Sequence, residues 1–150
     1  MAVTSQIQND IFFSDVPERE YAANVSSEHV KRLGQFFTPF PIAHFMAKWI
    51  ISNPQCKTIL DPAVGLGVFF RAILKEADVP SYQLIGYDVD PQVLKKAKIL
   101  FQGCEDCSIR LINRDYMFND WNNRYDGIIC NPPYQRFQNY KNRNEILAEF

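Results

Sequence analysis

The chain has 150 residues, a formal net charge of −1 and a hydrophobic content of 47%. This length fits one domain with enough apolar material for a core, and the balanced charge gives no general electrostatic argument for a nucleic-acid partner. No apolar run approaches the roughly 18 residues of a membrane helix and the first residues lack a signal-peptide pattern, so we expect no membrane association and a cytoplasmic location.

The first 33 residues are predicted to form an N-terminal helical arm. Residues 18–33 are charged and have weak helical periodicity. Ser26 or Ser27 is a suitable N-cap for a helix that contains Glu28 and Val30, because a serine oxygen can accept a hydrogen bond from the first free N–H groups.

A second helix is predicted to begin after Thr38. Thr38 followed by Pro39 is typical of an N-cap and a first helical residue. The unpaired N–H groups at such a helix start can bind a carboxylate, although a capped helix with Phe36 and Phe37 buried explains the pattern equally well. Several apolar residues of this helix share one face, which we expect to pack in the core. They are Ile42, Phe45, Met46, Trp49 and Ile50.

A short apolar strand at 57–60 leads into a turn with two glycines, followed by a helix to about Ala77. This is the first unit of a doubly wound sheet, and Gly65 and Gly67 let the backbone approach a ligand closely. The third glycine of a dinucleotide fingerprint would fall at Phe70, which argues against NAD, and no Gly-Lys-Ser/Thr sequence indicates a phosphate-binding loop. Asp61 at the strand end can hold a cationic group or cap the turn.

Three more strands are predicted at 83–87, 109–112 and 125–130. Polar residues follow them, namely Asp88, Asp115 and Asn131, as Asp61 follows the first strand. Because ligands of open α/β sheets bind beyond the carboxyl ends of the strands, we expect these side chains to meet in one crevice. Asp90 is predicted to cap the helix that begins at Pro91.

No metal site is expected. Cys104 and Cys107 have the spacing of a metal or redox pair, but no second pair or nearby histidine completes a zinc site. His29 and His44 are isolated in the sequence.

The last strand runs into Asn131-Pro132-Pro133-Tyr134. The asparagine offers one acceptor and two donors without charge, and the prolines stiffen the loop. With the flat ring of Tyr134 beside it, this loop suits a planar molecule that bears an amino group. The alternative is a rigid strand exit in which Tyr134 covers the core.

In this order, the motifs between Gly34 and Tyr134 resemble those of S-adenosylmethionine-dependent N6-adenine DNA methyltransferases. The resemblance is to the branch in which the cofactor motifs precede the catalytic tetrapeptide, as in type I modification subunits and fused restriction–modification enzymes. It implies an α/β, Rossmann-like methyltransferase domain over residues 34–150. The family sheet has seven strands, so we expect about four parallel strands here and the N-terminal part of a longer enzyme.

The resemblance also implies roles for individual residues. The segment 35–39 would close over the methionine end of the cofactor, Asp88 would bind its ribose, and Asp115 and Tyr116 its adenine. Val64 and Leu66 stand where many members have Cys and Ser. The implied cofactor-binding residues are Gln35, Phe36, Phe37, Thr38, Pro39, Asp61, Ala63, Gly65, Gly67, Asp88, Val89, Asp115, Tyr116 and Asn131. The implied catalytic residues are Asn131, Pro132, Pro133 and Tyr134.

The expected substrate is a DNA adenine flipped out of the duplex, with a specificity or restriction subunit or domain as a further expected partner. A protein glutamine methyltransferase is the nearest competing interpretation, since that family also uses Asn-Pro-Pro-Tyr, but it lacks the 35–39 motif at this place. An RNA amine methyltransferase and a non-catalytic cofactor-binding module are two further possibilities.

Overall fold

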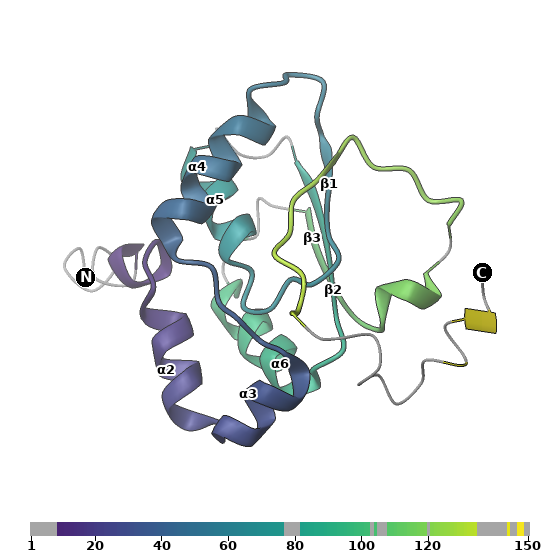
Figure 1. Cartoon of the computed structure of the whole chain (residues 1–150). Coiled ribbons are helices and arrows are strands. Elements are labelled where there is room, and N and C mark those ends of the chain that lie inside the picture. Colours follow the sequence, from purple (N-terminus) through teal and green to yellow (C-terminus); the bar gives the residue numbers. More distant parts are fainter. Residues whose placement is uncertain are drawn as a thin grey trace.

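The computed structural model describes residues 9–76, 82–102, 104, 108–119, 121–134, 144, 147 and 148. Within these residues, four parallel strands form one sheet in the order β3-β2-β1-β4 (Figure 1). They are β1 (Thr58–Asp61), β2 (Gln83–Asp88), β3 (Ser108–Asn113) and β4 (Gly127–Ile128). The predicted parallel α/β sheet is confirmed, and β4 is shorter than predicted because its pairing with β1 covers only two residues.

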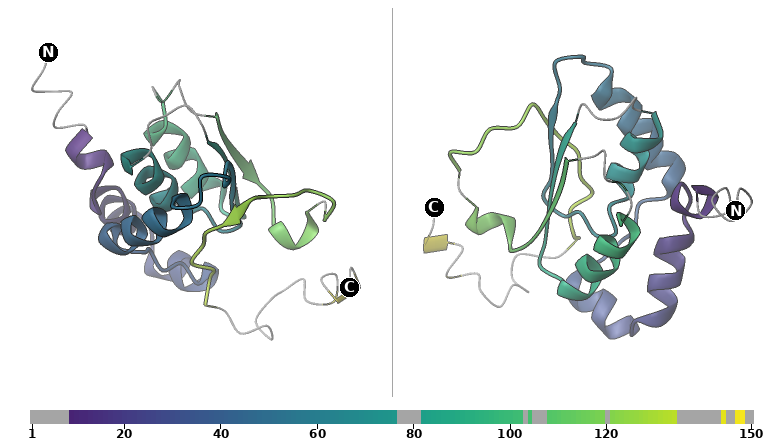
Figure 2. Two further views of the ribbon diagram at one scale, coloured as in Figure 1. Left: turned by 90° about the horizontal axis from the view of Figure 1, so that it is seen from above. Right: turned by 180° about the vertical axis from the view of Figure 1, so that it is seen from behind.

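The helices are distributed unequally over the two faces of the sheet. Helices α4 (Phe40–Ile51), α5 (Val68–Glu76) and α6 (Pro91–Leu100) lie on one face (Figure 2). The connection from β3 to β4 passes the other face and contains the short helix η1 (Tyr116–Phe118). The N-terminal arm forms α2 (Val16–Asn24) and α3 (Ser27–Leu33). None of the described helices has the length and apolar character needed to cross a membrane.

Two of the three predicted helix caps are confirmed. Ser26 accepts a hydrogen bond from the N–H of His29 at the start of α3, and Asp90 accepts one from Gln92 at the start of α6. The prediction that Thr38 caps α4 was wrong. Pro39 occupies that position, and the carboxylate of Asp15 accepts the N–H of Phe40 instead.

The prediction of the buried face of α4 was also wrong in most positions. Ile42, Phe45 and Trp49 are 53%, 74% and 76% exposed. The face that packs against the core carries smaller residues as well as large ones: Phe40, Ala43, Ala47 and Ile50. The two alanines permit α4 to approach α5 closely, and helical spacing alone does not choose between two apolar faces of one helix.

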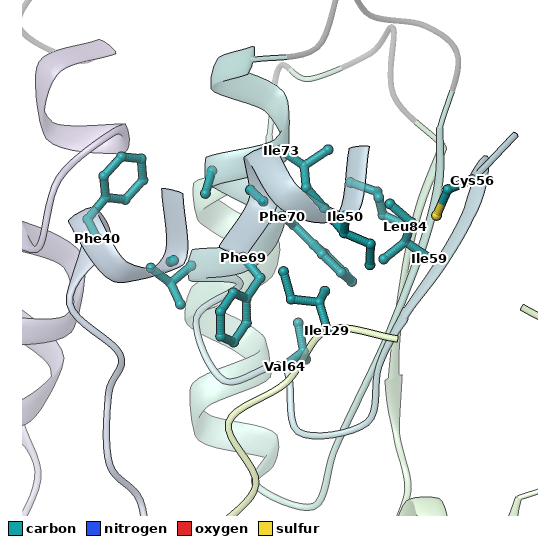
Figure 3. Close-up of a cluster of buried hydrophobic side chains, with 14 of the residues drawn as sticks. Phe40, Ile50, Cys56, Ile59, Val64, Phe69, Phe70, Ile73, Leu84 and Ile129 are labelled. Atoms are coloured by element: carbon teal, nitrogen blue, oxygen red, sulfur yellow. The ribbon is translucent and has the colours of Figure 1, made fainter. Parts of the chain in front are cut away.

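The main core lies between α4, α5 and the sheet (Figure 3). Ile59 of β1, Phe70 and Ile73 of α5, and Leu84 of β2 are almost completely buried. Ile129, which follows β4, joins the same cluster. This core therefore fixes β1, β2 and the residue after β4 relative to one another.

Gly86 in β2 leaves no room for a side chain. A Cβ atom there would lie 2.7 Å from Cγ2 of Val64, in the turn after β1. We expect Gly86→Ala to destabilise the protein by about 1–3 kcal/mol, the usual cost of overpacking. Urea denaturation measures this, and the cost should be smaller in a Val64→Gly background, where the whole opposing side chain is absent, including the Cβ that would lie 2.8 Å away. An equal cost in both backgrounds would contradict the steric explanation.

Candidate functional site

A cavity of about 780 Å³ lies at the carboxyl ends of the strands. It is formed by the segment after α3, the turn after β1, the ends of β2 and β3, and the loop after β4. Thirteen of the predicted site residues line it: Gln35, Phe36, Phe37, Thr38, Ala63, Gly65, Asp88, Val89, Asp115, Tyr116, Asn131, Pro132 and Pro133. The structure thus brings together residues that are up to 98 positions apart in the sequence.

The turn after β1 is held against the end of β2. Gly65 has a φ of +54°, which favours glycine. Its N–H donates to Oδ2 of Asp88 at 2.9 Å, and the N–H of Asp90 donates to Oδ1 at 2.9 Å. Burial raises the pKa of Asp88, although these backbone donors oppose the shift. Each carboxylate oxygen has a second lone pair, so Asp88 can still accept hydrogen bonds from ligand hydroxyl groups.

The amide of Asn131 connects the loop after β4 to the segment before α4. Its Nδ2 donates to Oγ1 of Thr38 at 3.1 Å and to the carbonyl of Phe36 at 3.3 Å. Its Oδ1 accepts the hydroxyl of Tyr134 at 3.0 Å. The rings of Tyr134 and Phe36 meet edge to face, with centroids 5.5 Å apart, and are 70% and 66% exposed. Asn131 therefore lies at the cavity beside two exposed aromatic rings.

Asp115 and Tyr116 line the opposite part of the cavity, after β3. Asp115 accepts the N–H of Met117 and thereby caps η1. The ring of Tyr116 packs edge to face against Tyr87 and Trp121. These contacts fix an aromatic ring and a carboxylate next to each other at the cavity wall.

Among the described residues, three carboxylates and one guanidinium line the cavity. They are Glu18, Asp88, Asp115 and Arg32. Glu18 is paired with the buried guanidinium of Arg71, which leaves Asp88 and Asp115 against Arg32. This small excess of acidic groups favours a ligand that carries positive charge and disfavours a polyphosphate.

The model of the N-6 DNA Methylase family matches residues 8–149 of the chain. The chain belongs to this family. It is 52% identical over 132 residues to the Type II methyltransferase M.AccI of Acinetobacter calcoaceticus, a match that covers 88% of this chain and 24% of M.AccI. It is also 30% identical over 107 residues to the Type II methyltransferase M.HincII of Haemophilus influenzae. This match covers 71% of this chain and 18% of M.HincII.

The family fold is also present in a solved structure. The type I restriction-modification system methyltransferase subunit from Streptococcus thermophilus superposes with a TM-score of 0.58 and 23% identity, over 68% of this chain and 24% of that subunit. The predictions of family and fold are confirmed. The chain spans about a quarter or less of the length of each of these relatives.

Four residues that the family resemblance places in the site are not among the cavity-lining residues described: Pro39, Asp61, Gly67 and Tyr134. Tyr134 lies beside the cavity through its contact with Phe36. Asp61 is completely buried behind the turn, where its Oδ1 accepts the N–H of Ala63. Of its two predicted roles, capping the turn agrees with this geometry and direct contact with a cationic ligand does not.

Burial raises the pKa of Asp61 to about 8, with a smaller contribution from the charge of Asp88. The folded protein therefore holds a proton that the unfolded chain releases near its ordinary pKa of 3.8, so stability should fall as the pH rises from 4 towards 8. The slope is at most about 1.4 kcal/mol per pH unit from this group. Asp61→Asn, which cannot titrate, should flatten the dependence of the unfolding free energy on pH. A slope unchanged in that variant would contradict the raised pKa.

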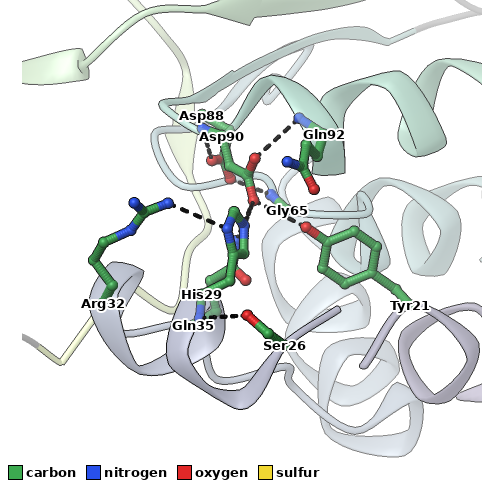
Figure 4. A network of polar contacts seen from close by, with 9 residues as sticks. All are labelled: Tyr21, Ser26, His29, Arg32, Gln35, Gly65, Asp88, Asp90 and Gln92. Atoms are coloured by element: carbon green, nitrogen blue, oxygen red, sulfur yellow. Dashed lines mark hydrogen bonds and ion pairs between the residues drawn. The ribbon is translucent and has the colours of Figure 1, made fainter. Parts of the chain in front are cut away.

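Gln35 lines the cavity and also takes part in a polar network around Asp90. Its side-chain amide donates a hydrogen bond to Oδ2 of Asp90 at 2.8 Å. The same oxygen lies 2.9 Å from the hydroxyl of Tyr21 and 2.7 Å from Nε2 of His29 (Figure 4). Burial alone would raise the pKa of Asp90, but the hydrogen bonds from His29, Gln35 and their neighbours lower it. Asp90 therefore joins the N-terminal arm and the cavity-lining segment to the start of α6.

Glu18 and Arg32 also line the cavity, and neither was predicted to do so. Both come from the N-terminal arm, and no local pattern distinguishes them from other charged helix residues. No group of three or more His, Cys, Asp or Glu side chains suited to a metal occurs in the described part of the chain, and Cys107 lies outside it.

Proposed function

We propose that the protein containing this sequence transfers a methyl group from S-adenosylmethionine to the exocyclic amine of an adenine in DNA. The observation that carries this proposal is the position of Asn131, which shares one cavity with the glycine turn and Asp88. A group that can accept amine hydrogens therefore lies next to a pocket suited to a nucleoside.

The charge of the cavity and the glycine turn in its wall support S-adenosylmethionine as the ligand. A sulfonium and an ammonium group match the cavity's excess of carboxylates, and Gly65 lets the cofactor approach the backbone closely. Asp88 would accept the ribose hydroxyls and Asp115 the amino group of the cofactor's adenine, with Tyr116 beside that ring. Residues 35–38, with Ala63 and Val89, would enclose the rest of the cofactor. When bound, the cofactor supplies an electrophilic methyl group.

The residues of the Asn-Pro-Pro-Tyr loop would act on the target base. Flipping the base costs a few kcal/mol, which stacking on the exposed ring of Tyr134 offsets in part. The carbonyl of Asn131 and the backbone carbonyl of Pro132 would accept the two amine hydrogens, while Pro133 stiffens the loop. These fixed dipoles would stabilise the positive charge that develops on the nitrogen, without a proton-accepting side chain. The methylated amine would then release one of its protons to solvent water.

Membership of the N-6 DNA Methylase family supports a DNA substrate. The solved neighbour is named as one subunit of a type I restriction-modification system, which supports the action of further subunits or domains. We propose that a specificity or restriction subunit or domain chooses the DNA site. Since its substrate would be genomic DNA, we also propose a cytoplasmic location.

The test offers cofactor with a labelled methyl group to unmethylated DNA, to RNA and to release-factor protein. We expect label in DNA, recovered as N6-methyladenine after hydrolysis to nucleosides. Label in glutamine or in RNA would instead establish a protein or an RNA methyltransferase, and cofactor binding without transfer to any of the three would indicate a non-catalytic module. The assay uses the complete protein that carries this sequence.

A further inference from the structure

The side-chain amide of Asn131 is fixed in one orientation by its neighbours. The carbonyl of Phe36 can only accept a hydrogen bond, so the atom that faces it at 3.3 Å must be the amide nitrogen. The same nitrogen lies 3.1 Å from Oγ1 of Thr38. A flipped amide would set two carbonyl oxygens against each other and leave both N–H groups without these acceptors.

Thr38 is only 8% exposed, and its hydroxyl is not used as the cap of α4. The Asp15 carboxylate caps that helix instead. The threonine hydroxyl is therefore available to accept the hydrogen bond from Asn131. A valine would have nearly the same shape but could not accept it.

We propose that Thr38 is a positioning residue that holds the Asn131 carbonyl toward the amine of the target base. This inference rests on the proposed function. Thr38 and Phe36 also line the cavity next to the turn after β1. A cofactor that orders the 35–39 segment would thus order Asn131 as well, and occupancy of the cavity would strengthen capture of the flipped base.

This link has a thermodynamic consequence. If the cofactor strengthens base capture through the Thr38–Asn131 bond, base capture strengthens cofactor binding by the same factor. Loss of the bond should reduce that factor while leaving the affinity for cofactor in the absence of DNA nearly unchanged.

The test compares Thr38→Val with Thr38→Ser in the complete protein. The serine variant keeps the hydroxyl and is the matched control. We expect Thr38→Val to lower the single-turnover rate of methyl transfer by roughly 10- to 100-fold, with the affinity for S-adenosylhomocysteine changed by less than about threefold. Thr38→Ser should retain a rate within about threefold of the wild type.

A second measurement reports on capture of the flipped base in the absence of methyl transfer. A duplex that keeps the target adenine and carries 2-aminopurine at the neighbouring position, where flipping of the adenine changes its stacking, is titrated with protein, with and without S-adenosylhomocysteine. The cofactor product should tighten binding to the flipped base in the wild type and much less in Thr38→Val. In an Asn131→Ala background, Thr38→Val should have no further effect on this tightening, whereas a general loss of folding would act in both backgrounds.

The outcomes separate this inference from the proposed function. A wild-type protein that methylates no adenine overturns the proposed function. A wild-type protein that methylates adenine, with Thr38→Val equal to it in rate and in cofactor-dependent base capture, overturns the role of Thr38 alone. An equal effect of Thr38→Val with and without the Asn131 side chain also overturns it.

Discussion

Asn131→Ala is expected to reduce methyl transfer by at least about 100- to 1,000-fold, the usual cost of removing one preorganised polar group from a developing charge. The substitution removes the side-chain acceptor at the cavity and leaves the glycine turn and the carboxylates of Asp88 and Asp115 in place. The affinity for S-adenosylhomocysteine should therefore remain within a few-fold of the wild type. Single-turnover kinetics and a binding titration measure the two quantities separately.

A matched control for this variant is Asn24→Ala. Asn24 lies on the exposed surface of α2, where its amide donates to the carbonyl of Glu20. Its loss should change neither methyl transfer nor cofactor binding, and stability by no more than about 0.5 kcal/mol. Turnover of Asn131→Ala close to that of this control would remove Asn131 from the mechanism.

The sheet and the cavity were largely predictable because their signals are local. Each strand is a short apolar run that ends in a polar side chain, and a parallel sheet places all such ends at one edge. Asp88, Asp115 and Asn131 meet at the cavity for this reason. Only Asp61 departs from the pattern, since its side chain turns behind the loop that it caps.

The contacts of the N-terminal arm were not predictable, because they join residues that are distant in the sequence. Asp15 caps a helix that begins 25 residues later, and Asp90 binds side chains from 55 to 69 residues earlier. Nothing in a threonine–proline pair reveals that an upstream carboxylate takes the capping role. For α4, the choice between two apolar faces was made by contact with α5 and not by helical periodicity.

A second large effect is expected from Arg71→Met, this time on stability. Arg71 in α5 is completely buried and forms an ion pair with Glu18 of α2, which is 5% exposed. It also donates to the carbonyls of Phe12 and Ser14, at 2.6 and 3.0 Å. The substitution would leave a buried carboxylate and two carbonyls without their donor. We expect a loss of about 3–5 kcal/mol, because the remaining charge stays out of water.

Chemical denaturation measures this loss, and the double variant with Glu18→Leu is the control. Replacing both members of a buried ion pair by apolar residues is often neutral, so the double variant should be more stable than Arg71→Met alone. A double variant less stable than Arg71→Met would show that the carboxylate is not the source of the loss.

The pH dependence of Arg71→Met gives an independent check of the same cause. Burial already raises the pKa of Glu18, and the charge of Arg71 opposes that shift. Without Arg71 the folded-state pKa should rise further above the ordinary value of 4.5, so the folded variant binds a proton that the unfolded chain has lost. The stability difference from the wild type should therefore shrink as the pH falls from 8 to 5. A difference that is constant over this range would mean that the lost hydrogen bonds to the arm, and not the buried charge, account for the destabilisation.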